Sequence, residues 1–149
     1  MLEIRTMTIE DYEGVYSLWT RIKGFAMRSI DDSKEGVLRF LDRNPNTSVV
    51  ALKDGRVVGS ILCGHDGRRG CLYHVCVDCG HRNQGIGSKM VRYAMEALEK
   101  EKISNVSLIA YTKNDIGNAF WKKIGWTNRS DLNYYDLVLN KENMIEFNR

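Results

Sequence analysis

The chain has 149 residues, a length typical of one domain with a buried core. Apolar residues make up 43% and charged residues 28% of it, as in a globular protein, and a net charge of +3 is too small to indicate a nucleic-acid-binding surface. No apolar run approaches the roughly 20 residues of a membrane helix, and residues 1–5 do not resemble a signal peptide. We therefore expect a single cytoplasmic domain over residues 1–149, without a membrane or nucleic-acid partner.

The first third of the chain predicts one strand and two helices. Residues 2–6 are expected to form the strand, and Thr8 with Asp11 forms a capping box that starts the first helix. The second helix is expected to begin at Asp32 or Ser33 and to end before Asn44-Pro45. Apolar residues at three-to-four spacing give each helix one buried face. They are Tyr12, Val15, Tyr16, Trp19 and Ile22 in the first helix, and Val37, Leu38 and Leu41 in the second.

Three strands are predicted next. Residues 47–53 and 56–63 are rich in apolar and β-branched side chains, and the Asp54-Gly55 pair between them is typical of a two-residue hairpin turn. A charged, glycine-rich turn over residues 64–70 leads into a short strand over 71–77. We interpret that turn as a solvated loop, with a loop that reaches the acceptor as the alternative.

A glycine loop follows the 71–77 strand and precedes an amphipathic helix over residues 86–101. Gly85 and Gly87 allow a close backbone approach at the start of this helix, where unpaired N–H groups and the positive end of the helix dipole favour an anion. A phosphate group is the ligand that this arrangement fits best, and Arg82 adds a positive charge beside it. The buried face of the helix is expected to hold Ile86, Met90, Ala94, Ala97 and Leu98.

The last third predicts a strand over residues 105–111, a helix capped by Asn114-Asp115 and a final strand over 134–139. Gly125 stands where a left-handed residue usually ends a helix. Residues 141–149 are expected to form a loose tail.

All four cysteines and all three histidines fall within residues 63–81. The pair Cys76-x-x-Cys79 could belong to a zinc site, but no second Cys-x-x-Cys completes a tetrahedral set. Cys71 and Cys76 occupy strand positions where a small buried residue would serve equally well. We therefore predict no metal site, and a zinc-stabilised interaction domain stays an alternative.

Other phosphate-binding loops demand residues that this chain lacks. No Gly-Lys-Ser/Thr occurs, which excludes a Walker loop, and Met90 stands where a dinucleotide fingerprint needs its third glycine. The remaining pattern, Val77-x-Cys79-x-x-Arg82-x-x-Gly85-x-Gly87, closely resembles the acetyl-CoA loop of the GNAT superfamily of N-acetyltransferases. The order of predicted elements is similar to the GNAT arrangement over almost the whole chain. The resemblance implies an α/β fold with a mixed, mostly antiparallel sheet of six to seven strands, about four flanking helices and splayed central strands.

The resemblance also implies that acetyl-CoA is the acyl donor and which residues border it. The family's glycine loop holds the pyrophosphate, and the strand before it pairs with pantetheine. Asn114, Trp121, Gly125 and Trp126 resemble the family's Asn-x6-Tyr-x3-Gly-Phe segment, which lies along the pantetheine arm. The residues expected to border the donor are Val75, Cys76, Val77, Arg82, Asn83, Gln84, Gly85, Ile86, Gly87, Ser88, Asn114 and Trp121.

The usual acid and base of the family are both replaced in this chain. Trp121 stands at the position of the proton-donating tyrosine, and an indole N–H is not an acid near neutral pH. Ile109 stands where some members carry a glutamate. Tyr111 would share a strand face with Ile109, and the imidazole of His74 suits a base near neutrality, so we name Tyr111 and His74 as catalytic candidates. Both residues also have ordinary structural interpretations, as a half-buried strand aromatic and a buried histidine.

These patterns together predict an N-acetyltransferase that moves an acetyl group from acetyl-CoA to a primary amine by direct attack in a ternary complex. A non-catalytic acyl-CoA-binding module is the main alternative, because the usual acid and base are missing. The acceptor would be a small-molecule or peptide amine, and a homodimer is an assembly that the resemblance allows. The segment expected to line the acceptor side contains Phe25, Met27, Arg28, Asp31 and Asp32.

Overall fold

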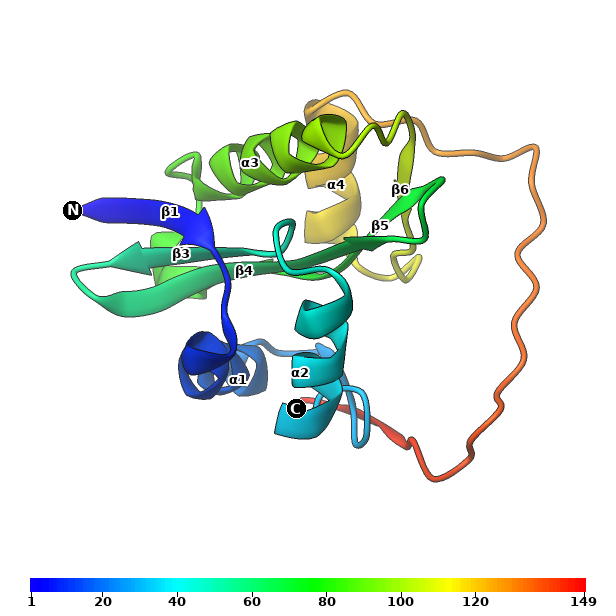
Figure 1. The fold of residues 1–149 in the computed structure, drawn as a ribbon, viewed down its shortest axis with the longest axis horizontal. Helices are drawn as coiled ribbons and strands as arrows, with labels where there is room; N and C mark the ends of the chain where they lie inside the picture. The colour runs from blue at the N-terminus through cyan, green and yellow to red at the C-terminus, as the bar shows by residue number, and fades with distance from the viewer.

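The computed structural model describes all 149 residues and has three layers, a five-stranded sheet between two pairs of helices (Figure 1). The strands are β1 (Leu2–Thr6), β2 (Ala26–Arg28), β3 (Val49–Lys53), β4 (Arg56–His65), β5 (Gly70–Val77), β6 (Val106–Leu108) and β7 (Ile145–Phe147). The helices are α1 (Tyr12–Arg21), α2 (Lys34–Arg43), α3 (Ile86–Lys100) and α4 (Asp115–Lys123), with short 3-10 turns η1 (Ile9–Asp11) and η2 (Cys79–His81). Helices α1 and α2 cover one face of the sheet, and α3 and α4 cover the other. The predicted fold class is confirmed.

The five-stranded sheet has the order β1-β3-β4-β5-β6 and is antiparallel except at one edge. There β5 and β6 run parallel, and their pairing ends at Leu72 and Leu108. Because β5 continues to Val77 while β6 stops, the second half of β5 has no strand beside it on that side. This splay creates a gap in the sheet edge directly before the glycine loop.

Local sequence signals fix most element boundaries. The turn residues Asp54 and Gly55 both have positive φ, 50° and 81°, as a two-residue hairpin requires. The Thr8 N–H donates to the Asp11 carboxylate at 2.9 Å, which confirms the predicted capping box. The Ser33 hydroxyl accepts the Gly36 N–H at 3.1 Å, so Ser33 rather than Asp32 caps α2.

Two apolar clusters form the core, one on each face of the sheet. The predicted helix faces are right in their main residues and wrong at their margins. Leu18 is buried in α1 while Tyr16 is 40% exposed, Leu38 of α2 is 39% exposed, and Val91 rather than Ala97 completes the buried face of α3. Periodicity finds the centre of such a face, whereas the neighbouring layer determines its width.

The C-terminal region differs from the prediction. No strand forms over residues 134–139, and residues 127–142 are exposed along an extended arc away from the sheet (Figure 1). The expected loose tail instead contains β7, which pairs antiparallel with β2. The Asn148 side chain donates to the carbonyls of Trp19 and Ile22 at 2.7 and 2.9 Å. A strand forms only where a partner edge is available, and here the partner is the short β2 segment.

The strand predicted over residues 105–111 is also shorter in the structure, spanning only β6. None of the helices combines the length and the apolar character that crossing a bilayer requires.

Candidate active site

The glycine loop presents a row of unpaired backbone N–H groups at the start of α3. Asn83 and Gly85 have left-handed φ values of 62° and 78°, and the first bond of the helix runs from the Lys89 N–H to the Gly85 carbonyl at 3.1 Å. The N–H groups of residues 83–88 donate to no backbone carbonyl. Left-handed and right-handed residues in succession curve the chain into a concave anion site. The loop therefore has the geometry predicted for binding a phosphate.

Two contacts tie this loop to the sheet. The Arg82 side chain turns back, so that Nε donates to the Val77 carbonyl at 3.2 Å and the guanidinium lies at the end of β5. Lys53 of β3 donates to the Gln84 side chain at 3.5 Å. Both cations therefore add positive charge beside the row of N–H groups.

Glycine is needed at the two positions of the loop for different structural reasons. A Cβ at Gly85 would meet nothing within 4 Å, so its positive φ is what requires glycine there. A Cβ at Gly87 would lie 3.2 Å from the ring of Phe120, so the missing side chain lets α4 pack closely against α3. Sequence reasoning did not identify Phe120, although it is this contact that places α4 beside the loop.

A β-bulge interrupts β5 opposite the gap left by β6. Ser60 pairs with Cys76 and Leu62 with Tyr73, so β5 carries one residue more than β4 over this stretch. The extra residue is accommodated at His74, whose φ is 49°. Val75 and Val77 pack towards the α3 face, whereas Cys76 lies in the cluster on the α1 face.

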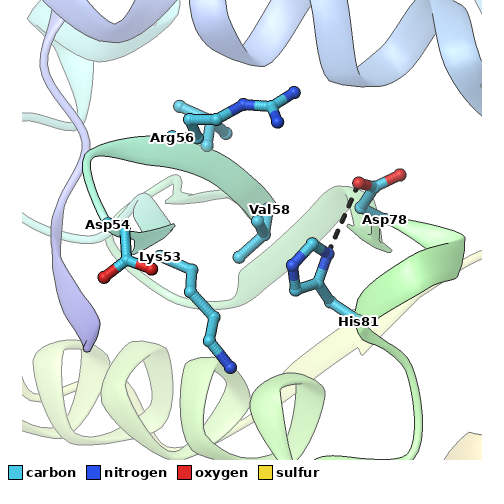
Figure 2. Close-up of a pocket in the computed structure, with 7 residues that line it drawn as sticks. Lys53, Asp54, Arg56, Val58, Asp78 and His81 are labelled. Atoms are coloured by element: carbon cyan, nitrogen blue, oxygen red, sulfur yellow. Dashed lines mark ion pairs between the residues drawn. The ribbon is translucent and has the colours of Figure 1, made fainter.

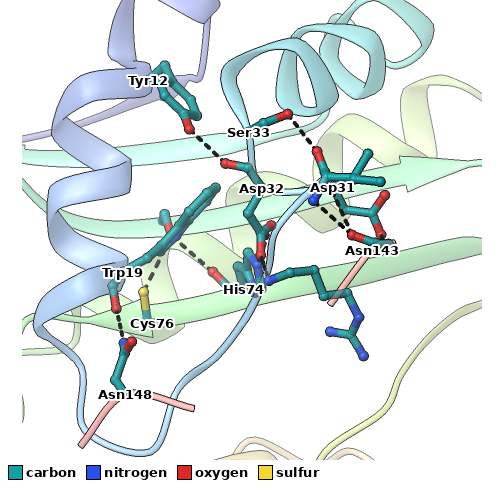
Figure 3. Close-up of polar contacts among 12 residues, drawn as sticks. Tyr12, Trp19, Asp31, Asp32, Ser33, His74, Cys76, Asn143 and Asn148 are labelled. Carbon is teal, nitrogen blue, oxygen red and sulfur yellow. Dashed lines mark hydrogen bonds and ion pairs between the residues drawn. The ribbon is translucent and has the colours of Figure 1, made fainter. Parts of the chain in front are cut away.

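The imidazole of His74 is held on the α1 face by a carboxylate and two aromatic rings. Nε2 of His74 lies 2.7 Å from Oδ1 of Asp32, which is only 4% exposed (Figure 3). The ring centroids of Trp19 and Phe25 lie 4.7 and 4.6 Å from that of His74. The structure therefore brings His74 together with Phe25 and Asp32, two residues expected on the acceptor side.

A buried hydrogen-bond chain supports the bulge from beneath. Trp19 Nε1 donates to Ser60 Oγ, Ser60 donates to the carbonyl of His74, and Cys76 Sγ lies 3.4 Å from the same hydroxyl (Figure 3). Burial raises the pKa of the Cys76 thiol to about 12. Cys76 therefore stays protonated near neutral pH and is a poor nucleophile. In the sequence, the signal for this set of hydrogen bonds was a serine within an apolar strand.

The predicted geometry of Tyr111 was wrong. Because β6 ends at Leu108, Ile109 and Tyr111 do not share a strand face. Both are exposed, at 66% and 52%, and the Tyr111 ring packs edge-on against Phe147 of β7 with centroids 5.5 Å apart. The Tyr111 side chain is half exposed, and the strand argument does not place its hydroxyl.

Asn114 and Trp121 each have a structural role in α4. The Asn114 side chain accepts the Gly117 N–H at 3.0 Å, which confirms it as the helix cap. Trp121 is half-buried and its ring lies 5.0 Å from that of Phe120 and 4.7 Å from that of Trp126. Gly125 has a φ of 96° and ends the helix as predicted.

The cysteines and histidines do not converge. Cys63 and Cys76 are buried, Cys79 is exposed, and no three metal-ligating side chains gather anywhere in the structure.

A polar pocket of about 200 Å³ lies between the β3–β4 hairpin and η2 (Figure 2). It is lined by Lys53, Asp54, Arg56, Val57, Val58, Asp78 and His81. Nδ1 of His81 lies 3.5 Å from the Asp78 carboxylate. The Asp54 carboxylate of this pocket is paired with the N-terminal ammonium group at 2.7 Å.

This chain is similar to known proteins in both sequence and fold. Residues 10–126 match the sequence model described as the acetyltransferase (GNAT) family. An acetyltransferase of Sodalis glossinidius is 30% identical over 83% of this chain and 85% of its own length. Ard1 from Thermoplasma volcanium superposes with a TM-score of 0.71 at 24% identity, covering 83% of this chain and 81% of that one. PaiA N-acetyltransferase from Thermoplasma acidophilum, solved in complex with coenzyme A, superposes with a TM-score of 0.72 at 19% identity, covering 84% and 89%. The family match spans most of the chain, which therefore belongs to the GNAT family of acetyltransferases.

Proposed function

We propose that the protein is an N-acetyltransferase that moves the acetyl group of acetyl-CoA to a primary amine of a small molecule or peptide. The observation that carries this proposal is the row of unpaired N–H groups at residues 83–88, beside the gap where β6 leaves β5. Membership of the acetyltransferase family makes acetyl-CoA the cosubstrate. The N-acetyl specificity and the amine acceptor are the proposed part.

In the proposed complex the pyrophosphate lies on the N–H groups of residues 83–88, with the Arg82 charge nearby. Pantetheine extends along the free edge of residues 75–77, where an N–H group can donate to the thioester oxygen as negative charge develops there. Asn114 and Trp121 would border the other side of the arm. The left-handed backbone at Asn83 and Gly85 and the bulge in β5 support this placement.

The amine would enter from the α1–α2 side and attack the thioester carbonyl directly. The N–C bond forms, the C–S bond breaks, the electron pair leaves on sulfur, and the amine gives up one proton. His74 and Tyr111 are the candidates to handle these protons. Positioning the two substrates contributes about 7 to 11 kcal/mol, whereas acid–base help adds roughly 10²- to 10⁴-fold, so a weaker acid and base are compatible with catalysis.

A non-catalytic acyl-CoA-binding module is the second candidate. The exposed Ile109 and the half-buried Trp121 favour it, because neither side chain can serve as the base or the acid of the usual mechanism. Incubation with labelled acetyl-CoA and a panel of amines separates the two candidates. An acetyltransferase gives labelled product, and a binding module gives none at any pH.

Calorimetric titration with acetyl-CoA tests the placement of the donor. We expect Gly85→Trp to abolish binding, because the new side chain would occupy the open space in front of the N–H groups. Arg82→Ala should weaken binding about tenfold by removing one charge-assisted contact. Gly67→Trp is the matched control, because Gly67 also has a positive φ and open space but lies in the β4–β5 turn. Unchanged affinity in both loop variants would reject the placement.

A further inference from the structure

Two histidines make the same short contact with a carboxylate. Nε2 of His74 lies 2.7 Å from Asp32 Oδ1, and Nε2 of His65 lies 2.7 Å from Glu101 Oε1. The first pair lies at the bulge of β5, and the second joins the end of β4 to the end of α3. The two pairs differ in what the other ring nitrogen does.

Nδ1 of His65 accepts the Gly67 N–H at 3.0 Å, so both nitrogens of that ring are used in the structure. Nδ1 of His74 has no partner within the chain, and it is not sealed from solvent as Nδ1 of His81 is. His74 therefore offers a free ring nitrogen. It lies two residues beyond Leu72, where the pairing with β6 ends.

Asp32 is itself fixed by contacts from three directions. Its second carboxylate oxygen accepts the Arg28 N–H of β2 at 2.6 Å, its backbone carbonyl accepts the Tyr12 hydroxyl of α1 at 2.7 Å, and Ser33 after it caps α2. An ionised carboxylate only accepts hydrogen bonds, so the ring nitrogen facing it must carry the proton. In the neutral imidazole the lone pair is then on Nδ1.

We propose that Asp32 is a positioning residue that holds His74 in the Nε2–H tautomer and so presents Nδ1 as the proton acceptor for the incoming amine. This inference rests on the proposed acetyl transfer. As the N–C bond forms, one proton passes from the amine nitrogen to Nδ1. The C–S bond breaks, and sulfur leaves with its electron pair as the thiolate of coenzyme A. The Asp32 carboxylate then stabilises the imidazolium, as in other carboxylate–histidine pairs.

Titratable groups face the pair from α1, β2, β5 and the turn before α2. Burial raises the pKa of Tyr12 on α1 and of Cys76 on β5 to about 12, so both stay neutral near pH 7. Arg28 of β2 contacts Asp32 through its backbone N–H, and Asp31 is paired with the Asn143 side chain at 2.8 Å. Trp19 and Phe25, which flank the ring, carry no charge.

Nitrogen-15 NMR of histidine-labelled protein tests the tautomer without any activity measurement. His74→Gln identifies the signals of His74. In the wild-type protein at alkaline pH we expect a protonated Nε2 and an unprotonated Nδ1 for His74. Asp32→Asn should mix the two tautomers of His74, because an amide can either donate or accept. A wild-type His74 with its proton on Nδ1 would overturn the positioning role.

Steady-state acetylation of an accepted amine tests the proton transfer. His74→Gln and Asp32→Asn should each lower kcat about 10²-fold, with little change in KM for acetyl-CoA. The contact between His65 and Glu101 has the same length as that between His74 and Asp32, so His65→Gln and Glu101→Gln are matched controls. Both should keep wild-type kcat. Equal losses in the control pair, or wild-type kcat in His74→Gln, would overturn the proposal. A wild-type protein that acetylates no amine would instead overturn the proposed function, and the NMR spectrum would still decide the tautomer.

Discussion

Nε1 of Trp19 donates a hydrogen bond to Oγ of Ser60 at 2.9 Å, joining the last turn of α1 to the middle of β4. The Ser60 hydroxyl in turn donates a hydrogen bond to the His74 carbonyl at 2.9 Å. Both Trp19 and Ser60 are fully buried. One hydroxyl thus satisfies two buried groups and supports the bulge that carries the candidate base.

Replacing Ser60 with alanine should therefore destabilise the protein. The Trp19 N–H and the His74 carbonyl would both lose a partner inside the core, so we expect the free energy of unfolding to fall by about 1 to 3 kcal/mol. Urea denaturation followed by tryptophan fluorescence measures this. Ser107→Ala, at an exposed position of β6, is the control and should change stability by less than about 0.5 kcal/mol. Equal stability of the two variants would show that the buried chain contributes nothing.

Gly85→Ala should weaken acetyl-CoA binding without a steric clash. An added Cβ has open space, but a left-handed backbone costs an alanine about 1 to 2 kcal/mol, which favours rearrangement of the loop. We expect about a tenfold loss of affinity by calorimetry. Gly67→Ala carries the same backbone strain in the β4–β5 turn and should leave affinity unchanged. Equal losses of affinity in both variants would mean that strain alone, wherever it lies, explains the effect.

The pair of Arg5 and Asp11 should make stability depend on pH in the acid range. Burial by itself raises the pKa of Asp11, but hydrogen bonds from the Arg5 guanidinium, both 2.8 Å long, and from the Thr8 N–H outweigh it and lower the pKa below 3.8. A carboxyl group with a lowered pKa stabilises the fold above its unfolded pKa. This stabilisation is lost as pH falls through the folded pKa.

We therefore expect Asp11→Asn to lower the free energy of unfolding by about 1.5 to 3 kcal/mol near pH 5. Between about pH 5 and pH 3, the free energy of unfolding of this variant should fall by less than that of the wild-type protein. Urea titrations at the two pH values measure both effects. Asp42→Asn, an exposed change on α2, should leave the pH dependence as in the wild-type protein. An identical acid-range slope in Asp11→Asn and wild type would contradict the assignment.

Three of the four cysteines should react with an alkylating agent in a fixed order. Burial raises the pKa values of Cys63 and Cys76 to about 12, whereas Cys79 is exposed. The thiolate is the reactive form, so we expect rapid alkylation of Cys79 and none of Cys63 or Cys76 until denaturant is added. Mass spectrometry of time points reads this out, with Cys79→Ser as the control that removes the fast phase. Rapid labelling of Cys76 in the native protein would contradict the raised pKa of its thiol.

The exposed arc over residues 127–142 should tolerate polar replacements. Leu139 is 92% exposed, so Leu139→Ser is expected to change the free energy of unfolding by less than about 0.5 kcal/mol, whereas Leu72→Ser in the core should be severely destabilising. Denaturation with analytical ultracentrifugation measures stability and assembly together. A loss of stability, or a shift from dimer to monomer, in Leu139→Ser would show that a second copy covers this segment, as in the homodimer that the resemblance allows.

The elements whose signals are local could be predicted from the amino-acid sequence. The Asp54-Gly55 turn, the Thr8–Asp11 box and the ends of α4 depend on residues within one turn of each other, so their chemistry is complete in the sequence. The glycine loop belongs to the same group, because its backbone conformation and its unpaired N–H groups follow from the residues of the loop. Fold class and family were predictable for this reason.

The arrangement around His74 depends on contacts between residues that lie far apart in the sequence. The bulge, the contact with Asp32 and the support from Ser60 join two strands and the turn before α2, and no spacing in the sequence encodes their distances. The ends of β6 and β7 were likewise decided by which edge was available for pairing, so the strand argument for Tyr111 failed. A strand or a buried polar contact is stabilised by its partner, and the partner is known only when the chain has folded.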